Sequence, residues 1–291
     1  GAGTGSAGVT PRGALATAGV LALGAAVSLG LARFSYALLL PAMRADLGWS
    51  YATAGAMNTV NAAGYLAGAL AMPALLRRAG PRAALLAGSF ATALLLALHG
   101  AVRAEVLLYA LRFGSGLASA LVFVAGGLMA AQLAATLPPG GRPAPSLVLG
   151  LYYGGTGLGI VACALGLPAV TALHWAPGWG LLAALALAAS VVMAWGAHVG
   201  APPTAGAGRA RAPLRPLAWG LAGYAMFGLG YIGYMTFVIT LLREQGLGGG
   251  VVTLFYALLG LAVMASPWLW AGLLQRHRGG RPMALLNALL A

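Results

Sequence analysis

Apolar residues in this chain form long, nearly unbroken runs that alternate with short polar stretches. A helix needs about 20 apolar residues, at ~1.5 Å each, to cross a bilayer. A ninth run, 283–291, is too short to cross. The pattern predicts an all-α integral membrane protein with about eight complete transmembrane helices and a ninth stub. The eight long runs are 15–41, 51–76, 83–98, 106–133, 147–170, 179–198, 217–242 and 251–274.

The longest polar connection, residues 199–216, is the best internal boundary. It is rich in proline, glycine and arginine, as expected for a loop. We therefore predict a six-helix N-terminal bundle (1–198), a cytoplasmic central loop (199–216) and an incomplete C-terminal bundle (217–291). Because the ninth run is short and the chain does not begin with methionine, we interpret it as a C-terminally truncated fragment.

Composition excludes most other classes of protein. The chain is 61% hydrophobic and 7% charged, whereas a soluble domain carries about 25% charged residues. The net charge of +13 comes from arginines, mostly in short loops, which favours a topology signal over nucleic-acid binding. The single Cys163 excludes an internal disulfide. We see no catalytic motif or metal-spaced cluster, and expect no enzyme, metal or cofactor.

The arginines predict an orientation. With the N-terminus in the cytoplasm, eleven loop arginines lie inside and three lie outside, which agrees with the positive-inside rule. The outer ones, Arg44, Arg103 and Arg243, each have an acid within two residues, which we expect to neutralise them locally. We therefore expect a multi-pass protein of a bacterial cytoplasmic (inner) membrane with a cytoplasmic N-terminus.

Two basic loops repeat at a constant spacing. Residues 77–82 (RRAGPR) recur 199 residues later as 276–281 (RHRGGR), and 30–36 align with 230–236, 200 residues later. Parallel repeats of this kind are one plan of secondary transporters. Chance similarity between arginine-rich loops is the alternative.

Both loops resemble motif A of the major facilitator superfamily (MFS), Gly-x-x-x-Asp-Arg-x-Gly-Arg-Arg/Lys, with arginine in place of the acid. Arg112, followed four residues later by Gly116, resembles motif B. The stretches GLARFSYALLLPAMRADLGWS and NAAGYLAGA resemble the YbfB/YjiJ-type branch of the superfamily. The resemblance implies a twelve-helix secondary transporter but no particular substrate. It also implies gating loops formed by Arg77, Arg78, Gly80, Arg82, Arg276, Gly279 and Arg281.

Two arginines, Arg33 and Arg112, lie within apolar runs. A lone arginine there costs roughly 3 kcal/mol or more unless it faces a bundle interior or a watery cavity. Counting from the outer ends of the runs, at ~1.5 Å per residue, places Arg33, Asn58, Arg112, Tyr234 and Tyr256 about 8–12 Å deep, in one polar layer. No acid lies in any run, so we expect a positive cavity suited to a carboxylate or phosphate. The candidate substrate-binding residues are Arg33, Tyr36, Asn58, Asn61, Arg112, Tyr231, Tyr234 and Tyr256.

Each candidate has a structural alternative. Arg33 is close enough to the outer headgroups to snorkel to them. Arg112 is equally suited to bonding neighbouring helices, as the motif B arginine often does. Asn58 and Asn61 suit hydrogen bonds between helices as well as ligand contact, and the tyrosines suit packing or a gate. Three Gly-x-x-x-Gly patterns, at 64–68, 150–154 and 155–159, predict close helix contacts.

The leading functional hypothesis is a secondary active transporter that moves a small organic anion by alternating access. A multidrug-type exporter of neutral or lipophilic compounds is the alternative, followed by a non-transporting membrane receptor. The expected partners are a small-molecule substrate and the lipid bilayer, with a coupling proton left open. We expect a monomer and no nucleic-acid partner.

Overall fold

The computed structural model describes residues 10–138, 143–199 and 214–276, which are helical and contain no strand. The predicted all-α membrane class is confirmed, since six stretches in these ranges are long and apolar enough to cross a membrane. The ninth run, Gly279, Arg281 and most of the central loop lie outside the described residues, and the three-part division stays a prediction. The elements are α1 (Pro11–Ala25), the π-helical segment η1 (Ala26–Phe34), α2 (Ser35–Leu47), α3 (Tyr51–Ala101), α4 (Glu105–Ala135), α5 (Pro145–Val170), α6 (Ala176–Gly196), α7 (Leu214–Glu244) and α8 (Gly249–Arg276).

The first three elements form one continuous rod. It begins where the hydroxyl of Thr10 accepts a hydrogen bond from the backbone N–H of Gly13, at 3.2 Å, which caps the helix. It ends at Gly48, whose φ of +66° suits glycine. The rod is longer than the predicted run because helix continues through Pro41 to Leu47. In its middle, η1 has the wide turns of a π-helix, which are often found at functional sites.

Helix α3 is a hairpin of two helical limbs. Its 51 residues would extend ~75 Å if straight, more than twice the ~30 Å hydrocarbon core. The break is at Gly80, where φ is +77° and ψ is 167°, a conformation that residues other than glycine rarely adopt. The limbs correspond to the predicted runs 51–76 and 83–98.

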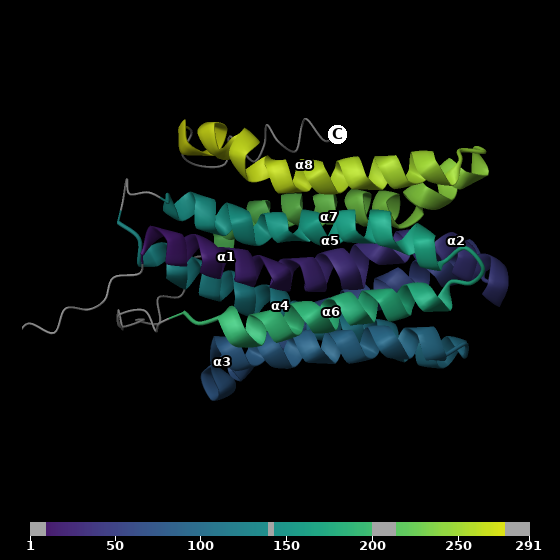
Figure 1. Cartoon of the computed structure of the whole chain (residues 1–291), viewed down its shortest axis with the longest axis horizontal. Coiled ribbons are helices and arrows are strands. Elements are labelled where there is room, and N and C mark those ends of the chain that lie inside the picture. The colour runs from purple at the N-terminus through teal and green to yellow at the C-terminus, as the bar shows by residue number, and fades with distance from the viewer. Residues whose placement is uncertain (1–9, 139–142, 200–213, 277–291) are drawn as a thin grey trace, which may run out of the picture.

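The helices run side by side, with α3 along one edge of the bundle and α8 along the opposite edge (Figure 1). One large buried cluster joins the elements from α1 to α6. A smaller cluster attaches α7 and α8 through α2 and α5, and its largest member, Tyr256, is fully buried. The second half of the described chain is therefore joined to the first across α2 and α5.

Glycines allow the closest helix contacts. A Cβ at Gly64 would overlap the carbonyl oxygen of Phe113, and one at Gly155 would overlap that of Ala22. A Cβ at Gly150 would lie 2.5 Å from the Cβ of Pro267, where α5 meets α8. The three Gly-x-x-x-Gly patterns are thus confirmed as sites of close packing, as in other membrane helices.

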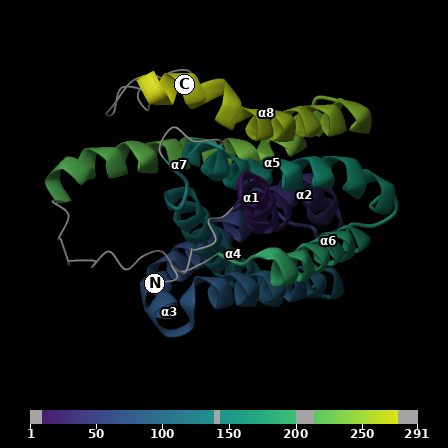
Figure 2. The same ribbon diagram turned by 60° about the vertical axis from the view of Figure 1, so that its left-hand side comes forward.

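Helix α7 packs closely at one end only. We call the end of the bundle that holds Asp46 the Asp46 end, and the opposite end, at Arg82, the Arg82 end. Near the Asp46 end, Met235 and Ile239 of α7 are buried, whereas Met226, toward the Arg82 end, is 64% exposed. Figure 2 shows this part of α7 leaving the bundle. Helix α7 is therefore held against the first half of the chain at the Asp46 end and lies apart from it at the Arg82 end.

Candidate solute-binding site

The side chain of Arg112 is fully enclosed, and each of its three nitrogens donates a hydrogen bond. Its Nε and Nη1 donate to the carbonyl oxygens of Met57 and Ala32, at 3.5 and 3.3 Å. Its Nη2 donates to Oδ1 of Asn58 at 3.3 Å, and the guanidinium lies 4.4 Å from the centre of the Tyr36 ring. Only 1% of its surface is exposed. Arg112 therefore bonds neighbouring helices to one another, which is the structural role given above as the alternative to substrate binding.

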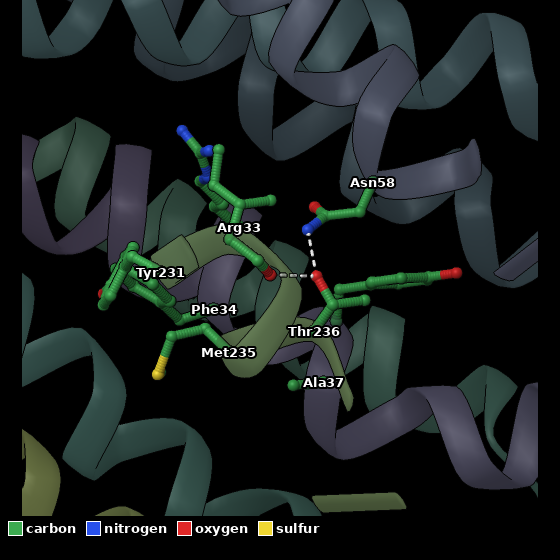
Figure 3. Close-up of a pocket in the computed structure, with 9 residues that line it drawn as sticks. Arg33, Phe34, Ala37, Asn58, Tyr231, Met235 and Thr236 are labelled. Atoms are coloured by element: carbon green, nitrogen blue, oxygen red, sulfur yellow. Dashed lines mark hydrogen bonds between the residues drawn. The ribbon is translucent and has the colours of Figure 1, made fainter. Parts of the chain in front are cut away.

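Asn58 connects this arginine to α7. Its Oδ1 accepts from Arg112. Its Nδ2 donates to the hydroxyl of Thr236 at 2.6 Å, a bond that Figure 3 shows. Thr236 in turn donates to the carbonyl oxygen of Ile232, four residues earlier. A chain of hydrogen bonds therefore runs from α4 through α3 to α7. Thr236 was not among the predicted site residues, since an isolated threonine in an apolar run gives no sequence signal.

Two further predicted site residues bond to backbone. Nδ2 of Asn61 donates to the carbonyl oxygen of Arg112 at 2.9 Å. The hydroxyl of Tyr36 donates to the carbonyl oxygen of Ala54 at 2.9 Å. Both side chains are buried, so in this conformation they hold α3 against α4 and α2.

Arg33 lies in the last turn of η1 and is only partly buried. Its guanidinium carbon is 5.8 Å from the centre of the Tyr65 ring, a cation–π contact. Among the residues that the structure describes, no acid forms an ion pair with Arg33. Figure 3 shows its guanidinium pointing away from the hydrogen bond between Asn58 and Thr236. Arg33 thus keeps its hydrogen-bonding capacity, whereas every nitrogen of Arg112 already donates.

A small cavity separates Arg33 from α7. It is lined by Phe34, Asn58, Tyr231 and Thr236, besides Arg33, and its volume is about 20 Å³. Such a volume holds about one water molecule. In this conformation the cavity is too small for an organic solute.

The predicted polar layer is only partly assembled. Tyr231 packs edge-on against Phe34, with ring centres 6.2 Å apart, and Tyr256 donates to the carbonyl oxygen of Phe34 at 2.7 Å. Tyr234 does not join the layer: it is 58% exposed and lines a separate, mainly apolar groove with Tyr51. The reason is rotational, because the buried face of α7 is the one that carries Thr236.

Charged side chains at the Asp46 end pair across helices. Nη2 of Arg44 in α2 lies 3.4 Å from Oε1 of Glu244 in α7. Tyr51 of α3 donates a hydrogen bond to the same carboxylate. Arg103 forms an ion pair with Asp46, with 2.8 Å between Nη1 and Oδ2. The expectation that each outer arginine is neutralised by its nearest acid in sequence is therefore wrong for Arg44 and Arg103.

Because the Arg44–Glu244 pair joins α2 to α7, we expect Glu244→Gln to weaken closure at the Asp46 end. An exposed ion pair contributes roughly 0.2–1 kcal/mol. The fraction of molecules that are open at the Asp46 end should therefore rise by up to about fivefold. Spin labels at Leu173 and Gln245, both exposed, would report this as a longer distance by pulsed electron paramagnetic resonance. The control is Glu105→Gln at the same end. Identical distance distributions for both variants would contradict this role.

The motif A-like loop at residues 77–82 contacts the end of α6. Arg82 donates to the carbonyl oxygens of Ala194 and Ala197, at 2.6 and 3.1 Å, at the end of α6, where a cation is favourable. Arg77 and Arg78 are exposed, and Gly80 supplies the turn. The side chain of Arg276 lies outside those described, and a gating role for either loop stays a prediction.

Long apolar helices packed around buried polar side chains define this molecule as a polytopic integral membrane protein. A family model described as "Uncharacterised MFS-type transporter YbfB" matches residues 25–290. The chain therefore belongs to this family of MFS-type transporters, and the predicted resemblance is confirmed. No curated protein matches it closely.

Proposed function

We propose that the protein is a secondary transporter of a small organic anion and that Arg33 binds the anionic group. The observation that carries this proposal is the contrast between the two arginines. Arg112 already donates to three oxygen atoms, whereas Arg33 faces an aromatic ring and no described acid. A partly buried guanidinium without a counter-ion suits bidentate binding of a carboxylate or phosphate.

Alternating access would use the contacts at the two ends in turn. We propose that the Arg82 end, which holds the arginine-rich loops, faces the cytoplasm of a bacterium and that the N-terminus is cytoplasmic. The packing of α7 at the Asp46 end then corresponds to a conformation closed to the outside and open to the cytoplasm. Opening the outer side would require breaking the contacts of Glu244 and Thr236 with the first half of the chain.

We base the proposed energy coupling on the positions of the acids. Asp46, Glu105 and Glu244, the acids of this chain, lie at or near helix ends at the Asp46 end. None sits beside Arg33, so we propose uniport or anion exchange by a monomer, with proton coupling as the alternative. In an exchanger, uptake of labelled anion depends on unlabelled anion inside the vesicle and not on a pH gradient.

Uptake by proteoliposomes tests the proposal. Across a panel of labelled carboxylates and phosphates, Arg33→Ala is expected to lower kcat/KM for the preferred anion by about 10–100-fold, the loss expected for charge-assisted hydrogen bonds. Arg33→Lys, which keeps the charge but not the fork of donors, should fall between this variant and the wild type. Arg12→Ala, at an exposed position in the first turn of α1, is the matched control.

Unchanged kinetics for every anion in Arg33→Ala would contradict the assignment of Arg33. Arg33-independent uptake of neutral or lipophilic compounds would favour the exporter. Specific binding without uptake would favour a receptor.

A further inference from the structure

An aromatic cluster lies between α4 and α5. The rings of Tyr152 and Tyr153 are 5.1 Å apart, and each lies within 5.8 Å of the Phe123 ring. Tyr152 is fully buried and donates to the carbonyl oxygen of Phe123 at 2.6 Å. We call Phe123, Tyr152 and Tyr153 the aromatic cluster. Its buried hydrogen bond fixes the rings between α4 and α5, so the cluster presents a rigid surface.

The cluster faces the interior beside α7. Tyr153 and Ile160 are seven residues apart on α5 and therefore share a face of the helix. Ile160 uses that face to pack in one cluster with Met235 and Ile239 of α7. Tyr153 lies two turns, ~10 Å, nearer the Arg82 end, where α7 has left the bundle, and it is 49% exposed. Its exposed surface thus faces the space between the helices.

Tyr65 connects the cluster to the arginine. Its ring lies beneath the guanidinium of Arg33, 5.8 Å away. Its backbone packs against Gly116 of α4, two turns before Phe123 and on the same face of that helix. One cation therefore lies on the Asp46 side of aromatic side chains from α3, α4 and α5. An arrangement with one charge and several rings matches a ligand with one charge of opposite sign and one apolar, flat part.

We propose that the transported solute is an aromatic carboxylate, whose carboxylate binds Arg33 and whose ring packs against Tyr65 and Tyr153. This inference rests on the proposed function and adds the chemical class of the solute. Aromatic rings gain from offset or edge-on contact with other rings beyond the area they bury. A short aliphatic acid would meet the same cation but leave the exposed side of Tyr153 uncovered.

Binding to the purified protein tests the proposal with three probes. Phenylacetate carries a ring and a carboxylate, acetate carries the carboxylate alone, and 2-phenylacetamide carries the ring without the charge. We expect phenylacetate to bind at least about tenfold more tightly than either of the others. Tyr153→Leu should weaken phenylacetate binding about 3–10-fold and leave acetate unchanged. The control is Trp195→Leu, which removes an 83% exposed ring from α6 and should change neither.

The outcomes separate this inference from the proposed function. If acetate and phenylacetate bind equally and both depend on Arg33, the anion site stands and the aromatic proposal is overturned. The same holds if other aromatic acids, such as benzoate, bind no better than aliphatic acids of similar length. If 2-phenylacetamide binds as tightly as phenylacetate and Arg33→Ala affects neither, both proposals are overturned. Loss of phenylacetate affinity in Tyr153→Leu, with an unchanged Tm, supports the aromatic contact.

Discussion

Replacement of Arg112 by methionine is expected to lower the apparent Tm of the detergent-solubilised protein by about 6 °C. Methionine approximates the volume of the side chain but removes its hydrogen bonds to Asn58 and to the carbonyl oxygens of Ala32 and Met57. Losing these bonds between a charged group and buried acceptors costs about 3 kcal/mol, and in a protein of this size each kcal/mol shifts Tm by about 2 °C. Differential scanning fluorimetry would measure the change.

The matched variant is Arg33→Met, which we expect to change Tm by less than about 2 °C. Arg33 is only partly buried, and its described contact is with the Tyr65 ring. Similar losses of Tm in the two variants would contradict the division of the arginines into a structural one and a ligand-binding one. A stable Arg112→Met protein would contradict the structural role directly.

A single methyl group at Gly116 is expected to cost about 2 kcal/mol of unfolding free energy or more. A Cβ there would overlap the carbonyl oxygen of Asn61, so α3 and α4 would have to move apart. Asn61 also donates to the carbonyl oxygen of Arg112, so the movement would disturb the support of that arginine. We expect Gly116→Ala to lower Tm by about 4 °C and to reduce uptake.

Gly19→Ala provides the control for this substitution. Apart from its own turn of α1, nothing lies within 4 Å of a Cβ at Gly19, so alanine adds helix propensity, about 0.5–1 kcal/mol, without a clash. Its Tm should be unchanged or slightly higher. If both alanine variants behave alike, close packing at Gly116 is not what stabilises the bundle.

The fold class could be predicted from the sequence because length and apolarity decide whether a helix can cross a bilayer. The turn at Gly80 and the close contacts of the Gly-x-x-x-Gly patterns could also be predicted from the sequence, since glycine allows both. The π-helical turns of η1 were not predicted. They lie where this rod packs closely against α5, since a Cβ at Gly30 would lie 2.6 Å from the Cα of Gly159.

The candidate site was less predictable, because distance along the chain does not fix rotation or pairing. Counting from the ends of apolar runs gives a depth for Tyr234 but not the face of α7 on which it lies, and that face is exposed. The helix of Arg33 continues to Leu47, beyond the end of the apolar run used for the count. The acceptors of Arg112 come from two other helices, and no spacing in the sequence joins them.

The most direct test of the central claim is the position of a bound anion. A brominated form of the carboxylate selected by the uptake panel would be located by its anomalous scattering in crystals of the protein. The account predicts density that joins the carboxylate to the guanidinium of Arg33, with Arg112 still bonded to Asn58. Density on the lipid-facing surface, or a carboxylate bound to Arg112 with Arg33 turned toward the headgroups, would contradict it.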